Sequence, residues 1–139
     1  MMGSKLISGN CHSDQRGFLF YNNDFDVSQV KRIYIVENKD IDFVRGWQGH
    51  QIEKRWFSAI TGKFKIELIR VDNWENPSKK LEVNTFIISS GTLDVIYIPQ
   101  GYISSIQSLE PHSKLLVMAD YLLGEIKDEY RYDIDYFKI

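Results

Sequence analysis

Apolar residues in this chain gather in short segments separated by polar or turn-forming residues, and no helical stripe lasts more than a few turns. The clearest segment is residues 63–71, in which Phe64, Ile66 and Leu68 alternate with charged side chains. Such alternation is typical of a strand with one buried face. Similar segments recur at a spacing of roughly 8 to 12 residues, which predicts an all-β sandwich or barrel.

Turn-forming clusters such as Asn22-Asn23-Asp24 and Thr61-Gly62 divide the chain into strands. The tail, residues 124–139, is rich in Asp, Glu and Tyr and predicts a short helix or an irregular arm. The sequence shows no internal repeat or linker, so residues 1–139 are expected to form a single domain. The predicted strands are residues 17–21, 30–37, 55–60, 63–71, 84–89, 92–98, 103–109 and 114–119.

Composition narrows the class of protein. With 139 residues, 43% hydrophobic and 26% charged, the chain has the make-up of a folded globular domain. Its net charge of −2 gives it no general attraction to nucleic acid. A single cysteine, Cys11, cannot form an internal disulfide, and no apolar run is long enough to cross a membrane. We therefore expect a cytoplasmic protein with no membrane or nucleic-acid partner.

Residues 44–51 (VRGWQGHQ) carry the most chemistry, because Arg45, Gln48 and His50 lie together with two glycines. Arginine supplies a fixed cation, and histidine titrates near neutral pH. On a regular strand Gly46, Gln48 and His50 share one face. If that face lines a barrel interior, His50 lies in a cavity; the alternative is a surface loop in which the Arg and His side chains are solvated.

The order of short motifs resembles the cupin-fold sugar-nucleotide 3,4-ketoisomerases, also called WxcM-like, and the related dTDP-4-dehydrorhamnose 3,5-epimerases. The tail, with residues 119–121, 128–133 and Phe137, is similar to the way those ketoisomerases end. The resemblance implies a cupin-type antiparallel β-barrel, or jelly roll, and a homodimer. The motifs that carry it are DQRG (residues 14–17), KRIYIV (31–36), RGWQGHQ (45–51) and YIPQGY (97–102).

Two positions depart from the family pattern. The ketoisomerases carry two histidines in the motif at residues 45–51, whereas this chain has Gln48 and retains only His50. The family also has a histidine shortly after the proline of the motif at residues 97–102, where this chain has Tyr102, Ile103 and Ser104. Metal-dependent cupins need a fuller set of ligands, so we expect no metal and no cofactor.

The resemblance implies removal of a proton next to a ketone on a nucleotide-linked, 4-keto-6-deoxy sugar, with a dTDP-sugar favoured. Such chemistry needs a base and a donor to the enolate oxygen. His50 suits the base, and Tyr34, Tyr102 or Gln48 could donate. The candidates for binding the substrate are Arg16 and Arg45 for the diphosphate, Trp47 for stacking, and Arg55, which could equally be the solvated start of a strand.

Two classes of function remain open at this point. The first is an isomerase or epimerase in the biosynthesis of surface-glycan sugars. The second is a sugar-nucleotide-binding or structural cupin that has lost the reaction, and Gln48 favours it. A metal-dependent dioxygenase lacks the ligand set. Edge strands of a small open sheet expose unpaired backbone N–H and C=O groups, which a second copy of the chain could cover. This supports a homodimer with exchanged N-terminal strands.

Overall fold

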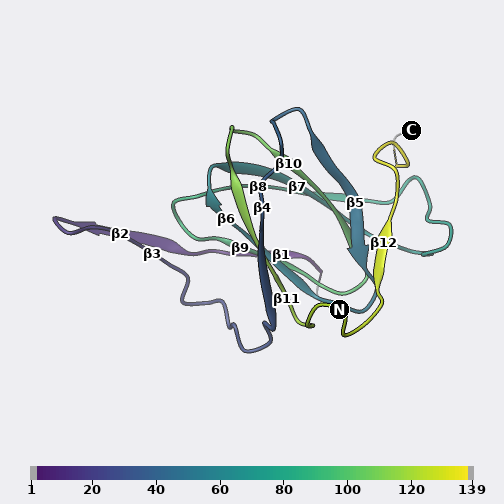
Figure 1. Ribbon diagram of the computed structural model, residues 1–139, viewed down its shortest axis with the longest axis horizontal. Coiled ribbons are helices and arrows are strands. Elements are labelled where there is room, and N and C mark those ends of the chain that lie inside the picture. The colour runs from purple at the N-terminus through teal and green to yellow at the C-terminus, as the bar shows by residue number, and fades with distance from the viewer. Residues whose placement is uncertain (1–2, 138–139) are drawn as a thin grey trace.

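The computed structural model describes residues 3–137, and these form two five-stranded sheets and one two-stranded hairpin. The two larger sheets face each other as a flattened barrel (Figure 1). No helix occurs between residues 3 and 137, and none of that part of the chain could therefore cross a membrane as a helix. The strands are β1 (Lys5–Ile7), β2 (Asn10–Asp14), β3 (Gly17–Tyr21), β4 (Arg32–Val36), β5 (Val44–His50), β6 (Arg55–Thr61), β7 (Lys63–Arg70), β8 (Val83–Ser89), β9 (Val95–Ile98), β10 (Tyr102–Ser108), β11 (Lys114–Ala119) and β12 (Glu129–Arg131).

Every strand pair is antiparallel. The first sheet has the order β1-β9-β6-β11-β4, and the second has the order β12-β5-β10-β7-β8. Neighbouring strands are therefore often far apart in sequence: β5 lies between β10 and the C-terminal β12. The pairing of β5 with β12 brings the motif of residues 44–51 next to the tail.

Apolar side chains from both sheets meet in the space between them. Phe57 and Leu115 of the first sheet pack in one cluster with Phe64, Ile66 and Leu68 of the second. The alternation that predicted a half-buried strand at residues 63–71 is confirmed, because these β7 side chains are fully buried while the charged residues between them are not. Burial of such side chains supplies the main favourable free energy of folding.

The C-terminal segment covers the outer face of the second sheet. There Trp47 packs in a separate cluster with Ile69 and Ile103, and Phe137 meets the indole edge-on at 5.4 Å between ring centroids. The tail is thus an irregular arm that includes one short strand, β12. It forms a second layer over β5 rather than a free end.

The β2–β3 hairpin extends away from the barrel (Figure 1). Phe18, Leu19 and Phe20 on β3 are 73%, 61% and 49% exposed, and the rings of the two phenylalanines stack at 6.1 Å. Apolar side chains exposed side by side on a projecting hairpin usually mark a surface that binds a protein.

The turn between β6 and β7 generates a prediction about stability. Gly62 has a φ of +79°, and a Cβ atom there would lie 2.0 Å from Oγ of Ser113. That hydroxyl accepts a hydrogen bond from the backbone of Lys63 and donates one to Glu110. Gly62→Ala therefore adds a steric clash to the strain of a left-handed backbone, and we expect the free energy of unfolding to fall by about 2–4 kcal/mol in urea titrations.

Gly124 provides the matched control. It has the same φ of +79°, but nothing lies within 4 Å of the position where a Cβ would be. Gly124→Ala should cost only the backbone strain, about 1 kcal/mol. Equal losses for the two variants would contradict the clash at Ser113.

Candidate active site

An irregularity in β5 decides which of its side chains face the barrel interior. Gln48 pairs with Ser104 and Arg45 pairs with Ile106, so β5 has one residue more than β10 between these two pairs. Such a β-bulge reverses the alternation of side chains. Arg45 therefore faces the cavity with Gln48, whereas Trp47 is buried on the outer face. Gly46, expected on the face of Gln48, lies under Ile134 on the outer side, where a Cβ would be 2.8 Å from Cδ1.

Three neighbouring strands place their polar side chains in two rows on the inner face. Directly opposed residues of antiparallel strands share a face. One row runs across the sheet through Glu129, His50 and Tyr102, and the next through Arg131, Gln48 and Ser104. The first of each row comes from β12, the second from β5 and the third from β10. The tail thus extends the polar surface that β5 begins.

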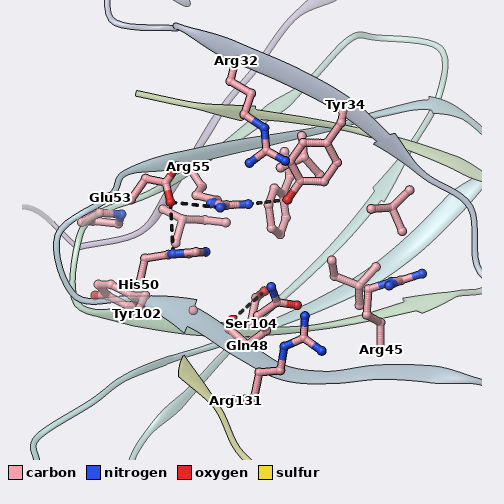
Figure 2. Close-up of a pocket in the computed structure, with 17 residues that line it drawn as sticks. Arg32, Tyr34, Arg45, Gln48, His50, Glu53, Arg55, Tyr102, Ser104 and Arg131 are labelled. Atoms are coloured by element: carbon pink, nitrogen blue, oxygen red, sulfur yellow. Dashed lines mark hydrogen bonds and ion pairs between the residues drawn. The ribbon is translucent and has the colours of Figure 1, made fainter. Parts of the chain in front are cut away.

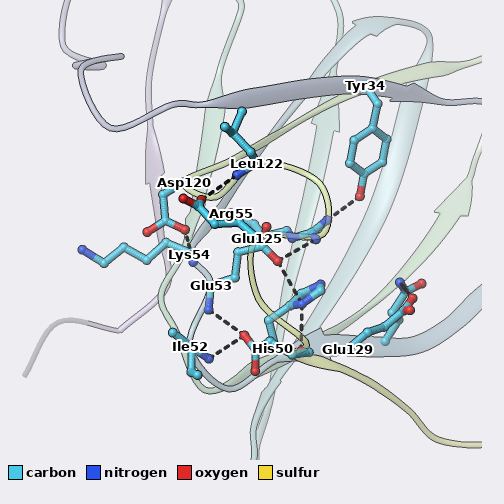
Figure 3. Close-up of polar contacts among 12 residues, drawn as sticks. Tyr34, His50, Ile52, Glu53, Lys54, Arg55, Asp120, Leu122, Glu125 and Glu129 are labelled. Carbon is cyan, nitrogen blue, oxygen red and sulfur yellow. Dashed lines mark hydrogen bonds and ion pairs between the residues drawn. The ribbon is translucent and has the colours of Figure 1, made fainter.

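His50 belongs to a buried chain of charged and polar groups. Its Nδ1 lies 3.0 Å from Oε2 of Glu53, and the same oxygen lies 3.0 Å from Nη2 of Arg55. Nη1 of Arg55 donates to the hydroxyl of Tyr34. Figure 3 shows these contacts as a continuous path from β5 through the following loop to β6 and β4. The side chains of His50, Glu53 and Arg55 are about one-tenth exposed, so the buried Glu53 carboxylate depends on the charge of Arg55 and on its contact with His50.

The surroundings of His50 keep its imidazole neutral. Burial lowers the pKa of His50 below its usual 6.5, and the positive charge of Arg55 lowers it further, while Glu53 and Asp128 act in the opposite direction. Nδ1 faces two acceptors, the Glu53 carboxylate and, at 3.0 Å, the backbone oxygen of Asp128. The nitrogen facing acceptors carries the hydrogen, which leaves Nε2 with a free lone pair.

Asp128 holds the loop after β5 in place. Its carboxylate accepts hydrogen bonds from the backbone N–H groups of Gln51, Ile52 and Glu53, at 2.8–2.9 Å. Donor atoms of His50, Glu53 and Asp128 also lie within 4.8 Å of one another, the arrangement of a metal site. Both carboxylates are already engaged, and the Arg55 guanidinium adjoins the cluster, so these residues do not fit a cation.

A cavity of about 240 Å³ lies in front of His50 and is rich in arginine. Arg32 on β4 faces Arg45 and Arg131 across this space (Figure 2). Arg32 lies over the ring of Tyr34 at 4.5 Å, and Arg45 donates to Asn38 at 3.3 Å. Within residues 3–137 neither guanidinium forms a salt bridge, so both are available to an anionic ligand.

A second hollow, of about 200 Å³, adjoins the first and shares His50, Gln48 and Arg55 as lining residues. Another wall is formed by residues of the segment from Tyr121 to Glu129. The two hollows form one cleft that runs from the interior of the barrel to the tail. His50 lies where they meet.

Six of the eight predicted site residues line this cleft, and two do not. Arg16 lies at the tip of the β2–β3 hairpin, where it pairs with Asp14 at 2.7 Å, and Trp47 points into the outer apolar cluster. Trp47 directly precedes Gln48, which faces the cavity, so ordinary alternation along the strand turns the indole to the outer face. Those that line the cleft are Tyr34, Arg45, Gln48, His50, Arg55 and Tyr102.

Sequence reasoning missed several members of the site. Arg32 is in the predicted strand at residues 30–37, and alternation with Tyr34 could have placed it on the same face. Glu53 is three residues after His50, and this spacing does not by itself predict that the two side chains are in contact. Arg131 and Asp128 lie in the tail, and only the long-range pairing of β12 with β5 brings them to the site.

The sequence matches one known protein family over almost its whole length. The family model described as "FdtA: WxcM-like, C-terminal" matches residues 2–139. The chain belongs to this family. The resemblance read from the motifs is thereby confirmed. A search of curated proteins finds no relative at significant similarity.

Several solved structures share the fold. A 3,4-ketoisomerase from Helicobacter canadensis superposes with a TM-score of 0.72 at 19% identity, over 99% of this chain and 97% of that one. A 3,4-ketoisomerase from Thermoanaerobacterium thermosaccharolyticum, solved with TDP-4-keto-6-deoxyglucose, gives 0.73 at 20% identity, over 99% and 93%. The Mycobacterium tuberculosis rmlC epimerase gives 0.78 at 11% identity, over 99% and 73%. The expected cupin-type all-β barrel is confirmed.

The charge network predicts how the pKa of His50 responds to its partner. In Glu53→Gln the negative charge that raises this pKa is lost, and the charge of Arg55 is no longer compensated. The pKa of His50 should therefore fall further below 6.5, as measured by NMR titration of its imidazole signals. The loss of one partner of a buried pair also costs about 3–5 kcal/mol, so circular dichroism must first show that the variant is folded.

Glu82→Gln is the control for this titration, because Glu82 is exposed and lies outside the cleft. It should leave the pKa of His50 unchanged. An unchanged or raised pKa in Glu53→Gln would contradict the assigned contact between Glu53 and His50.

Proposed function

We propose that this protein is an isomerase or epimerase that acts on a nucleotide-linked 4-keto-6-deoxy sugar, with His50 as the base. The observation that carries the proposal is the buried, neutral imidazole of His50, oriented by Glu53 at the centre of an arginine-rich cleft. Membership of the WxcM-like family supports it. So does the fold shared with ketoisomerases, one of which is solved with TDP-4-keto-6-deoxyglucose.

The chemistry begins with a C–H bond next to the ketone. Nε2 of neutral His50 takes the proton, and the electron pair of that bond forms the C=C bond of an enolate as the carbonyl oxygen becomes negative. The imidazolium that forms is stabilised by Glu53, 3.0 Å from Nδ1. The carbonyl moves when the proton is returned to the neighbouring carbon, C4, while the proton of the C3 hydroxyl passes to the oxygen on C4, which leaves the C=O bond at C3. Return of the proton to the opposite face of the same carbon instead inverts that centre.

Tyr34 is placed to stabilise the negative oxygen. Its hydroxyl accepts a hydrogen bond from Arg55, so its own hydrogen is free to donate into the cavity. A cationic neighbour strengthens that donation. Tyr102 is a second candidate: its ring lines the cavity beside His50, but its hydroxyl reaches toward Gly3, whose ideal Cβ position is 3.4 Å away. We therefore favour Tyr34 for this role.

The arginines suit the diphosphate of the nucleotide. Arg32 and Arg45 line the cleft and form no salt bridge within residues 3–137, and guanidinium groups pair with phosphate oxygens in a bidentate manner. A dTDP-sugar is the substrate we favour. The single cysteine and this substrate class agree with a cytoplasmic enzyme.

A second candidate function is a sugar-nucleotide-binding cupin without the reaction. Gln48 favours it, because an amide cannot transfer a proton at the position where the ketoisomerases carry a histidine. The network around His50 favours the enzyme, since a merely structural histidine does not need a free nitrogen facing a cavity.

We also propose a homodimer in which the β2–β3 hairpin packs against a second copy. Its exposed phenylalanines need a cover, and the strands at both edges of the barrel carry exposed apolar residues, among them Ile33 and Ile35 on β4. In this arrangement Arg16, at the tip of the hairpin, remains a candidate for binding the partner's substrate.

Proton exchange tests the proposed reaction. In D₂O the wild-type protein should introduce deuterium at C3 or C5 of dTDP-4-keto-6-deoxyglucose, as followed by NMR. His50→Asn should slow this exchange by about 10²- to 10⁴-fold because the base is lost. The kcat/KM of the wild type should fall on acidification through the lowered pKa of His50, which lies under 6.5, because only the neutral imidazole accepts a proton.

Substrate binding without exchange would overturn the isomerase and support the binding cupin. Exchange at the wild-type rate in His50→Asn would keep the reaction but remove His50 as its base. A kcat/KM that does not fall on acidification through the pKa of His50, as found by NMR titration of its imidazole, would also contradict that role.

The dimer is tested by mass in solution. Light scattering should give about twice the chain mass of 16.3 kDa. The double variant Phe18→Ser and Phe20→Ser should shift the protein toward the monomer, because it removes the apolar side chains that the second copy would bury. Leu123→Ser is the control, since Leu123 is 79% exposed but lies outside the hairpin. A monomeric wild type would refute the dimer.

A further inference from the structure

Glu129 occupies a position beside the proposed base that the reaction described above does not use. It pairs with His50 across β12 and β5, so the two side chains lie next to each other on the inner face. Figure 3 shows Glu129 beside His50, and both line the hollow below the tail. The base therefore has a carboxylate as its immediate neighbour on one side and Tyr102 on the other.

One oxygen of this carboxylate is held from two sides. Oε1 accepts a hydrogen bond from the amide of Gln48 and two more from Arg131, from Nε at 3.1 Å and Nη2 at 2.8 Å. The other oxygen, Oε2, accepts no hydrogen bond from any of residues 3–137. The side chain is 49% exposed, so Oε2 is open to a ligand in the cleft. Gln48 and Arg131 thus fix the direction of an unoccupied acceptor.

The charge of Glu129 limits what it can bind. The hydrogen bonds from Arg131 lower the pKa of Glu129, with further lowering by the charges of Arg131, His50 and Arg55. At neutral pH the group is a carboxylate, which accepts hydrogen bonds and donates none. It repels phosphate. The part of a nucleotide sugar that supplies a donor to such an oxygen is a hydroxyl of the sugar ring.

We propose that Oε2 of Glu129 binds the C3 hydroxyl of the keto sugar, on the carbon next to the ketone from which His50 removes hydrogen. Opposed residues on neighbouring antiparallel strands have Cβ atoms about 4.5–5.5 Å apart, so the groups that they touch must lie close together on the ligand. A hydrogen and a hydroxyl on one carbon meet that condition. This assignment rests on the proposed function and gives Gln48 a positioning role.

The amide that Glu129→Gln introduces should reverse the polarity of this contact. Gln48 and Arg131 both donate to one oxygen, so the carbonyl oxygen of the new amide would occupy that place. The NH₂ group would then lie where Oε2 accepted a hydrogen bond. The variant keeps the size of the side chain but presents a donor to the hydroxyl.

The test combines this variant with a substrate that lacks the hydroxyl. Deuterium exchange at C3 is measured for dTDP-4-keto-6-deoxyglucose and for its 3-deoxy analogue, which retains hydrogens next to the ketone. With the hydroxylated substrate, Glu129→Gln should lower kcat/KM by about 10- to 100-fold, mainly through KM, because the contact exists before and during proton removal. With the 3-deoxy analogue the loss should be less than about threefold, because no hydroxyl is present to lose its partner.

Glu110→Gln is the matched control: Glu110 is an exposed carboxylate outside the cleft, and its variant should match the wild type on both substrates. Equal losses for Glu129→Gln on both substrates would overturn the hydroxyl contact, and so would an unchanged rate on both. Wild-type exchange confined to C5, which bears no hydroxyl, would overturn it and leave an epimerase. Absence of exchange in the wild type would instead overturn the proposed function itself.

Discussion

The site depends on one constraint: a carboxylate buried inside a barrel must have partners. Glu53 is 7% exposed and meets this requirement through His50 on one side and Arg55 on the other. Loss of Arg55 would leave an uncompensated buried charge, and loss of the His50 contact would remove a hydrogen bond to the same carboxylate, so the three side chains hold one another in a single arrangement. The arrangement fixes the imidazole, frees its second nitrogen and aligns Arg55 with Tyr34. The geometry proposed for catalysis and the stability of the fold thus depend on the same contacts.

Most of the fold could be predicted, because the larger strands carry a signal in their own sequence. Residues 114–119 and 17–21 match β11 and β3, and other predicted strands differ from the observed ones by a few residues at their ends. The exceptions are β1, β2, β5 and β12. β5 contains two glycines and a bulge, which break the alternation, and β12 is three polar or aromatic residues with no pattern of their own.

The site was less predictable, for a different reason. A motif such as residues 44–51 shows which groups are available, but a one-residue bulge decides which of them face inward, and the bulge is defined by pairing with β10. That is why Arg45 lines the cleft and Gly46 lies on the outer face, the reverse of what regular alternation predicts. Groups supplied by the tail, among them Arg131, become part of the site only through the pairing of β12 with β5.

The three hydrogen bonds that Asp128 accepts from consecutive backbone N–H groups join segments that are far apart in the sequence, and therefore segments made at different times during synthesis. The loop carrying Glu53 is held by a residue that the ribosome adds 75 positions later. The core strands of both sheets end at Ala119, before Asp128 in the sequence. The loop that carries Glu53 lacks these hydrogen bonds until Asp128 has been added. A chain that ended before Asp128 would therefore contain the core strands of both sheets but lack the contacts that hold the loop of Glu53.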